Sequence, residues 1–378
     1  MKIHYWSPFF SKIATIQAVL RSANSLIEYG KNKKYNVSII DAIGEWNEYK
    51  NTINKDINII RLNTFNFLKI IPKNSYLKSR FSYIFIFCLN FFKLNNLIKN
   101  EKPDYLIIHL ITSLPIFLSV FHKKTKIILR ISGLPKINFF RKYFWKLFSN
   151  NIYKVTCPTQ ATYNYLKEIK IFPDEKLLVL KDPIIDIKKF CILSKSSLEK
   201  KFLNKTVITG IGRLTKQKNF ELLIIFFKKI EKEFPNFILV ILGEGEEREK
   251  LQKIINDLDI QKKVFLLGYE SNVYKFLKNT KYFILSSLWE DPGFVLIEAG
   301  ISNSTILSSD CPNGPKEIIQ NEKFLFRNND IDDLIKKFKF LENNKNNDFI
   351  YGQKKDVKKR IKDFTKFNHF KNLIKILN

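Results

Sequence analysis

The sequence predicts an α/β protein with two doubly wound parallel sheets. At 378 residues the chain exceeds the length at which a single hydrophobic core keeps growing, so two domains are expected. Short apolar runs alternate with segments of helical periodicity, which is the order typical of such sheets. The alternation stops after Pro183 and begins again at Val207. We therefore expect one domain over residues 1–190 and a second over residues 200–350.

Six apolar runs in the first half are expected to form buried parallel strands. They are residues 3–6, 37–40, 57–62, 105–109, 126–131 and 177–180. A helix is predicted after the first run, because apolar residues recur there at helical spacing. These residues are Ile13, Ile16, Leu20, Ala23 and Ile27.

The second half repeats this order more clearly. Its expected strands are residues 207–211, 237–242, 264–267, 282–286 and 305–308, each followed by a helical pattern. Residues 184–205 carry no strand-like run and are rich in Lys and Ser, which suits a connection between domains. The chain after Asn343 is rich in Lys and Asn, yet several apolar residues share one helical face. These are Phe364, Phe367, Phe370, Ile374 and Leu377. Residues 351–378 are expected to form helices that pack back on the first domain.

The chain is strongly basic, with 65 Lys and Arg against 36 Asp and Glu and a formal net charge of +29. Such a charge attracts polyanionic surfaces, and nucleic acid and anionic lipid both qualify. Codon bias in an AT-rich genome is an alternative source of the excess of Lys and Asn. No recognition-helix, zinc-finger or RNA-binding sheet motif accompanies the charge, so we expect no nucleic-acid partner.

Several features indicate a cytoplasmic protein. The cysteines at 88, 157, 191 and 311 form no close pair, which predicts neither a disulfide framework nor a zinc site. The first ten residues hold no sustained apolar core, so no signal peptide is expected. The longest apolar stretch, residues 81–92, is interrupted by Asn90 and is shorter than the roughly 20 residues that a membrane span needs.

The segment TGIGRLTKQKNF, residues 209–220, predicts a phosphate site at the end of a strand. Gly210 and Gly212 allow a ligand to approach the backbone closely, and Arg213 and Lys218 follow around a turn that leads into a helix. Arg offers a fork of donors and Lys a point charge, so this pair could neutralise a diphosphate without a metal. The alternative is that both cations are simply solvated.

A second segment, SLWEDPGFVLIEAG at 287–300, separates Glu290 from Glu298 by seven residues around a Gly-centred turn. A strand that ends in a short loop, here with Gly293, and then a helix places free backbone N–H groups and the positive helix end where a diphosphate could sit. The acids of GEGEE, residues 243–247, are interpreted as helix N-terminal residues favoured by the helix dipole.

Two further motifs follow predicted strands. In VFLLGYESNVYKFL, residues 264–277, Gly268 and Tyr269 could meet a flat base edge, although a plain loop is the alternative. In SSDCPNGPKEII, residues 308–319, a turn rich in Asn, Gly and Pro precedes a helix. Together with GRLTKQKN, GEGEE and the two glutamates, this arrangement resembles the retaining family-4 glycosyltransferases, over roughly residues 206–320. The members most similar to it build bacterial surface polysaccharide, capsule and lipopolysaccharide.

The resemblance implies a GT-B fold, in which two Rossmann-like domains face each other across a cleft. It implies that Arg213 and Lys218 hold the donor diphosphate and stabilise the charge that develops as the sugar leaves. Glu290 would face the transferred sugar, and Glu298 would accept hydrogen bonds from ribose hydroxyls. The N–H groups of Phe294 and Val295 would add to the phosphate site.

The first domain follows the family pattern only in outline. Relatives usually carry a glycine-rich loop after the first strand, whereas SPFFSKIATIQ at 7–17 has no glycine and offers Ser7 and Lys12 instead. Where relatives often place a His, ILRISGLPK at 128–136 offers Ser132 and Gly133. His109, at the end of its predicted strand, could approach the site, although a structural role is the alternative.

Two aromatic and basic segments suggest contact with an anionic membrane surface. In the first, a predicted helix flanked by cations carries a broad apolar face of Phe81, Ile84, Phe85, Cys88, Phe92 and Leu94. The second mixes cations with aromatics at Phe139, Phe140, Arg141, Lys142, Phe144, Trp145 and Lys146. Core packing of the same aromatics is the alternative for residues 81–94.

The expected function is retaining transfer of a hexose or N-acetylhexosamine from a nucleotide sugar, UDP-linked by expectation, to a lipid-linked glycan or lipopolysaccharide. The enzyme would lie peripherally on the inner face of the cytoplasmic membrane. No cofactor or metal is expected, because no D-x-D motif follows a predicted strand. Sugar-nucleotide epimerisation on the same fold, glycoside hydrolysis by the two glutamates and nucleic-acid binding are the alternatives.

Overall fold

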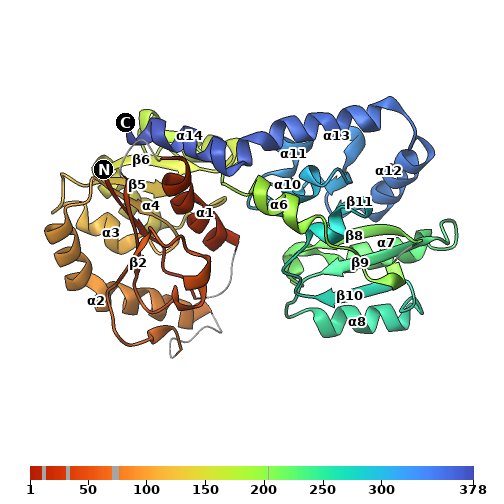
Figure 1. The fold of residues 1–378 in the computed structure, drawn as a ribbon, viewed down its shortest axis with the longest axis horizontal. Helices are drawn as coiled ribbons and strands as arrows, with labels where there is room; N and C mark the ends of the chain where they lie inside the picture. Colours follow the sequence, from red (N-terminus) through yellow and green to blue (C-terminus); the bar gives the residue numbers. More distant parts are fainter. Residues whose placement is uncertain (11–13, 31–34, 70–75, 203) are drawn as a thin grey trace. The chain divides into compact units, whose positions relative to one another are not determined.

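The computed structural model describes residues 1–10, 14–30, 35–69, 76–202 and 204–378. The chain divides into two compact units, each built on one parallel sheet (Figure 1). The first unit comprises Met1–Ile184 together with Lys366–Asn378, and the second comprises Ile185–Thr365. The predicted α/β class with two parallel sheets is confirmed. Of the C-terminal segment 351–378, the part before Lys366 belongs to the second unit and the rest to the first.

The first unit contains a seven-stranded sheet of order β3-β2-β1-β4-β5-β6-β7. Its strands are β1 (Lys2–Trp6), β2 (Asn36–Asp41), β3 (Asn58–Arg61), β4 (Tyr105–Ile108), β5 (Lys126–Arg130), β6 (Ile152–Cys157) and β7 (Leu177–Val179). The sequence indicated all of these except β6, where the half-buried Tyr153 and Lys154 interrupt the apolar pattern. The strand order reverses between β1 and β4, which is where open α/β sheets bind ligands.

Helices cover both faces of this sheet. They are α1 (Ala14–Tyr29), α2 (Tyr76–Glu101), α3 (Ser113–Leu118), α4 (Phe139–Phe148), α5 (Gln160–Glu168) and α14 (Lys366–Leu377). The C-terminal α14 packs beside α1, and its Phe370, Leu373 and Leu377 join the core cluster of that face (Figure 1). The Tyr105 hydroxyl donates to the carbonyl of Leu377 at 2.7 Å, which fixes the end of the chain to β4.

The second unit contains a six-stranded parallel sheet of order β10-β9-β8-β11-β12-β13. Its strands are β8 (Thr206–Ile211), β9 (Phe237–Leu242), β10 (Val264–Gly268), β11 (Thr280–Leu285), β12 (Thr305–Ser309) and β13 (Leu325–Phe326). The sequence indicated the first five, whereas β13 is too short to give a pattern. Here the strand order reverses between β8 and β11, so their two carboxyl ends form the expected ligand edge.

The helices of the second unit are α6 (Ile187–Leu193), α7 (Phe220–Ile230), α8 (Arg248–Asp257), α9 (Tyr274–Leu277), α10 (Phe294–Ile301), α11 (Pro315–Ile319), α12 (Ile331–Asn343) and α13 (Asp348–Ile361). Helix α13 approaches α10 at Gly300, where an added Cβ would lie 2.8 Å from Val357 Cγ1. This close approach requires glycine, since any side chain would push the two helices apart.

Helix α2 is longer than the sequence pattern indicated. Asn90 does not break it, because its amide is buried, donates to the Ile86 carbonyl at 3.0 Å and accepts from Asn63 Nδ2 at 2.9 Å. Within the described ranges, the segment Phe81–Glu101 is the one whose length and apolar composition alone would allow it to cross a membrane.

Candidate active site in the second unit

The loops that follow β8 and β11 bring Lys218 and Glu290 together. Lys218 Nζ lies 2.6 Å from Glu290 Oε1, although the residues are 72 positions apart. The two side chains are only 14% and 4% exposed, so the ion pair is largely shielded from water. Because β8 and β11 are neighbours at the reversal of strand order, this pair lies at the edge of the sheet where ligands bind.

Glu290 is held by several segments of the unit. The Ser287 hydroxyl donates to the same Oε1 that Lys218 contacts, and the Glu290 N–H donates to the Pro312 carbonyl at 3.1 Å. Gly293 has a φ of +87°, and an added Cβ would lie 3.5 Å from Glu290 Cγ. The other carboxylate oxygen, Oε2, makes no hydrogen bond to any described residue. Glu290 therefore has a fixed position and one oxygen available to a ligand.

Lys218 is positioned by the turn that the sequence singled out. An added Cβ on Gly212 would lie 3.0 Å from both Cδ and Cε of Lys218, so the lysine stem runs across the glycine. The Ser286 hydroxyl donates to the Lys218 carbonyl at 2.8 Å. Gly212 therefore gives the lysine side chain room to reach Glu290.

The two glycines of GEGEE have a packing role that the sequence interpretation missed. An added Cβ on Gly243 would lie 1.8 Å from the Gly212 carbonyl oxygen, and one on Gly245 would lie 2.3 Å from that of Leu214. The loops after β8 and β9 thus meet backbone to backbone. Glu244 is not in the first turn of a helix as predicted, because α8 begins at Arg248 and its N-cap is Glu247. Its exposed side chain pairs with Arg248 at 3.0 Å, which is a structural role.

Arg213 differs from Lys218 in its surroundings. Its side chain is exposed and makes no ion pair or hydrogen bond within the part of the chain that the structure describes. A guanidinium without an internal partner at this edge is free to bind an anionic ligand with its planar fork of donors.

Helix α10 begins directly after Glu290 and Gly293. Its N-cap is Gly293, no side chain caps it, and its first turn contains no acid. The N–H groups of Phe294 and Val295 find no acceptor among the described residues, whereas that of Leu296 bonds to the Gly293 carbonyl at 2.9 Å. Free N–H groups at a positive helix end attract anions. Glu298 lies one turn further along this helix and is half-buried.

Gly268 ends β10 at the same edge of the sheet, and Tyr269 follows it. Gly268 has a φ of +81°, and its carbonyl accepts a hydrogen bond from the Gly243 N–H at 2.7 Å. The Tyr269 ring is 81% exposed and is therefore available for stacking.

The predicted residues of the first unit lie at the ends of β1, β4 and β5. Ser7 is fully buried, and its hydroxyl has no partner among the described residues. His109 is buried, and its backbone N–H donates to the Trp6 carbonyl at 2.8 Å. Burial and, to a lesser degree, the charge of Arg130 lower the pKa of His109 well below its usual value, so the ring is neutral. Lys12 lies outside the described residues.

Ser132 and Gly133 follow β5 and are half-buried. The Ser132 hydroxyl accepts from Arg130 Nη1 at 2.8 Å, and Arg130 also forms a buried ion pair with Asp182. Both partners of that ion pair line a small cavity of the first unit that also contains His109 and His369. Sequence reasoning missed Arg130, Asp182 and His369, and the one available signal was a charged residue inside the apolar run of β5.

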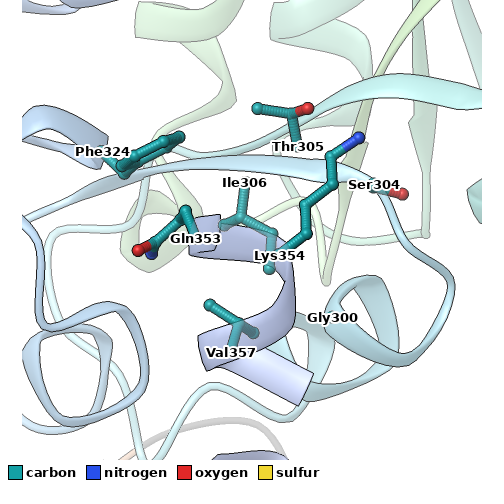
Figure 2. Close-up of a pocket in the computed structure, with 8 residues that line it drawn as sticks. All are labelled: Gly300, Ser304, Thr305, Ile306, Phe324, Gln353, Lys354 and Val357. Atoms are coloured by element: carbon teal, nitrogen blue, oxygen red, sulfur yellow. The ribbon is translucent and has the colours of Figure 1, made fainter. Parts of the chain in front are cut away.

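The second unit contains another small cavity, between β12 and α13 (Figure 2). Ser304 and Thr305 line it together with Lys354, whose pKa is lowered by burial and then by the charges of Lys358 and Lys281. Since β12 begins at Thr305, this cavity lies at the opposite edge of the sheet from Glu290 and is not part of the candidate active site.

Comparisons with known proteins show which family and fold the chain resembles. Residues 195–360 match the family Glycosyl transferases group 1. An uncharacterized glycosyltransferase of Methanocaldococcus jannaschii is 33% identical over 274 residues, which cover 66% of each chain. A Campylobacter jejuni enzyme, an N-acetylgalactosamine-N,N'-diacetylbacillosaminyl-diphospho-undecaprenol 4-alpha-N-acetylgalactosaminyltransferase, is 32% identical over 132 residues, 35% of each chain. The matched segments thus span about two thirds and about one third of these relatives.

Among solved structures, Anabaena HepE in complex with UDP is similar to the whole chain. The TM-score is 0.76 at 13% identity, and the match covers 100% of this chain and 99% of HepE. At this identity the likeness shows the fold alone. The chain therefore has the GT-B fold of glycosyltransferases. Its residues 195–360 belong to the glycosyl transferases group 1 family, as the resemblance read from the sequence implied.

Proposed function

We propose that the protein transfers a hexosyl or N-acetylhexosaminyl group from a UDP-sugar to a lipid-linked glycan or lipopolysaccharide, with retention at the anomeric carbon. One observation carries the proposal: the shielded Lys218–Glu290 pair lies at the same strand ends as an exposed arginine and an uncapped helix start. This combination provides positive groups for a diphosphate and a carboxylate for a sugar.

The donor diphosphate would bind between Arg213 and the N-terminus of α10. Arg213 has no internal partner among the described residues, and the N–H groups of Phe294 and Val295 have no acceptor there. The leaving diphosphate gains negative charge as the glycosidic bond breaks. Fixed donors aimed at that charge lower the barrier, because they need no reorganisation during the reaction. These groups would do the electrostatic work without a metal ion.

Lys218 and Glu290 would act on the transferred sugar and its phosphate. The Lys218 ammonium donates one of its three N–H groups to Glu290 Oε1. The other two can donate to phosphate oxygens. Glu290 Oε2 would accept a hydrogen bond from a sugar hydroxyl. The ion pair therefore couples the position of the sugar to that of the leaving group.

The nucleoside would extend toward α10 and β10. Glu298 would accept hydrogen bonds from the ribose hydroxyls, and the exposed Tyr269 with the Gly268 turn would meet the base. A UDP donor is supported by the bound UDP in HepE. A lipid-linked acceptor is supported by the diphospho-undecaprenol substrate that the name of the Campylobacter relative records. An enzyme with such an acceptor would work at the inner face of the cytoplasmic membrane.

The test is a transfer assay with a panel of UDP-sugars and a polyprenyl-diphosphate glycan acceptor. We expect acceptor-dependent release of UDP and a product whose anomeric configuration matches that of the donor. Glu290→Gln should lower kcat by about 100-fold or more, while Lys216→Ala, an exposed cation in the same turn, should leave kcat unchanged. Conversion of the donor without acceptor to an epimer would contradict transfer, as would cleavage of a simple nitrophenyl glycoside.

A further inference from the structure

Large apolar side chains lie exposed on three neighbouring segments of the first unit. Their exposed fractions run from 41% for Phe85 to 80% for Phe140. The α2 members are Phe81, Ile84, Phe85 and Phe92, Phe121 follows α3, and the α4 members are Phe139, Phe140, Tyr143 and Leu147. We call these nine residues the apolar face. An exposed apolar group of this size marks an interaction surface.

The α2 members form one stripe along the helix. Positions 81, 84, 85 and 92 repeat at helical spacing and lie opposite the buried Ile86, Leu94 and Ile98. Of the helix face that the sequence singled out, only Leu94 is buried. Helix α2 therefore has two apolar sides, one in the core and one in solvent.

Helices α2, α3 and α4 form one layer on the sheet. The ring of Phe117 in α3 lies 5.9 Å from that of Phe87 in α2 and 5.9 Å from that of Phe148 in α4. All three helices contribute buried residues to the same core cluster. Because their inner sides face one sheet, we infer that the outer sides of α2 and α4 face the same direction. Phe121 follows α3, and its ring lies 5.9 Å from that of Phe117, between the two.

The chain segments that carry the apolar face contain cations and no acid. Residues 105–167 contain no Asp or Glu and ten cations, and residues 76–100 likewise contain no acid. The ten are Lys123, Lys124, Lys126, Arg130, Lys136, Arg141, Lys142, Lys146, Lys154 and Lys167. Two of them are paired with acids, because Arg130 is buried against Asp182 and Lys167 contacts Asp174. Lys124 and Lys142 are exposed beside the aromatic residues. A surface with aromatic side chains between cations suits the headgroup region of an anionic bilayer.

We propose that the apolar face is the surface by which the protein lies on an anionic lipid bilayer, with α2 in the plane of the membrane. This proposal rests on the proposed function only for the choice of membrane, the inner face of the cytoplasmic membrane. A second copy of the chain fits less well, since two such faces would bring like charges together. Crossing the bilayer would expose the polar side of α2, where Ser82 and the hydrogen-bonded Asn90 are buried against the unit.

The test is sedimentation with vesicles of phosphatidylcholine and phosphatidylglycerol mixed about three to one, compared with phosphatidylcholine alone. We expect binding to the anionic vesicles that weakens as salt is added. Phe139→Ser/Phe140→Ser should reduce partitioning about 100-fold, roughly tenfold for each exposed ring. The matched control is Tyr351→Ser, a 74% exposed aromatic in the second unit, which should bind as the wild type does.

A second pair of variants tests the charge. Lys124→Gln/Lys142→Gln should weaken binding about 25-fold, roughly fivefold for each cation, whereas Lys253→Gln/Lys262→Gln in the second unit should have no effect. Equal binding of wild type and Phe139→Ser/Phe140→Ser would overturn the proposal. A wild-type dimer that dissociates in the Phe139→Ser/Phe140→Ser variant would also overturn it. So would an oligonucleotide that binds the apolar face more tightly than the anionic vesicles bind it.

UDP binding separates this proposal from the proposed function. The serine and glutamine variants should retain the thermal shift that UDP causes, because their positions lie in the other unit from the donor site. Loss of vesicle binding with UDP binding intact supports the membrane face. Vesicle binding without any UDP binding would support the proposal that the apolar face binds membranes and would contradict the proposed UDP-sugar donor.

Discussion

Replacing Lys218 with Met would leave the Glu290 carboxylate buried with the Ser287 hydroxyl as its one remaining side-chain donor among the described residues. Breaking a buried ion pair in this way costs about 3 kcal/mol or more, because one charge stays uncompensated in a poorly solvated site. Lys218 and Glu290 are 14% and 4% exposed, so solvent screening reduces this cost little. For a unit the size of Ile185–Thr365, we expect the melting temperature to fall by about 6–12 °C.

The double variant Lys218→Met/Glu290→Gln identifies the cause. It removes both charges and keeps similar volumes, so it should recover about 2 kcal/mol of the loss while remaining inactive. Differential scanning calorimetry of the wild type, both single variants and the double variant completes the cycle. The claim that Lys218 and Glu290 form a buried ion pair would be refuted by either of two results. One is a Lys218→Met protein that melts at the wild-type temperature, and the other is a double variant less stable than either single variant.

Further predictions concern two glycines and two histidines. Gly293→Ala should cost about 1–2 kcal/mol and weaken UDP binding, because its φ of +87° is strained for alanine; unchanged calorimetric binding would argue against this. Gly243→Ala should destabilise the second unit more than Gly293→Ala does, because the alanine Cβ would lie 1.8 Å from the Gly212 carbonyl oxygen. Urea denaturation of both variants measures this difference. The lowered pKa values of His109 and His369 mean that the unfolded chain binds more protons. Stability should therefore fall as the pH drops below about 6.5, and replacing both by Asn should flatten this dependence.

The sequence predicted the fold because strand and helix periodicities differ and both are strong in this chain. It failed at β6, where Lys154 and Tyr153 are only half-buried and mask the apolar signal. It also underestimated α2, because an interior Asn normally favours a break. Tertiary hydrogen bonds from Asn63 and to the Ile86 carbonyl override that tendency.

The sequence identified the residues of the candidate site but not their pairing. Lys218 and Glu290 were selected separately, and their 2.6 Å contact depends on β8 and β11 being neighbours in the sheet. Strand order follows from the whole unit's packing and leaves no local pattern. The same is true of the buried Arg130–Asp182 pair, whose partners lie 52 positions apart.

The difference in affinity between UDP and uridine, measured by isothermal titration calorimetry, tests the central claim most directly. If Arg213 and the start of α10 hold a diphosphate, UDP should bind the wild type about 100-fold more tightly than uridine does. Most of that preference should disappear in Arg213→Ala while the melting temperature of the free protein stays unchanged. An equal preference for UDP in wild type and Arg213→Ala would contradict the claim.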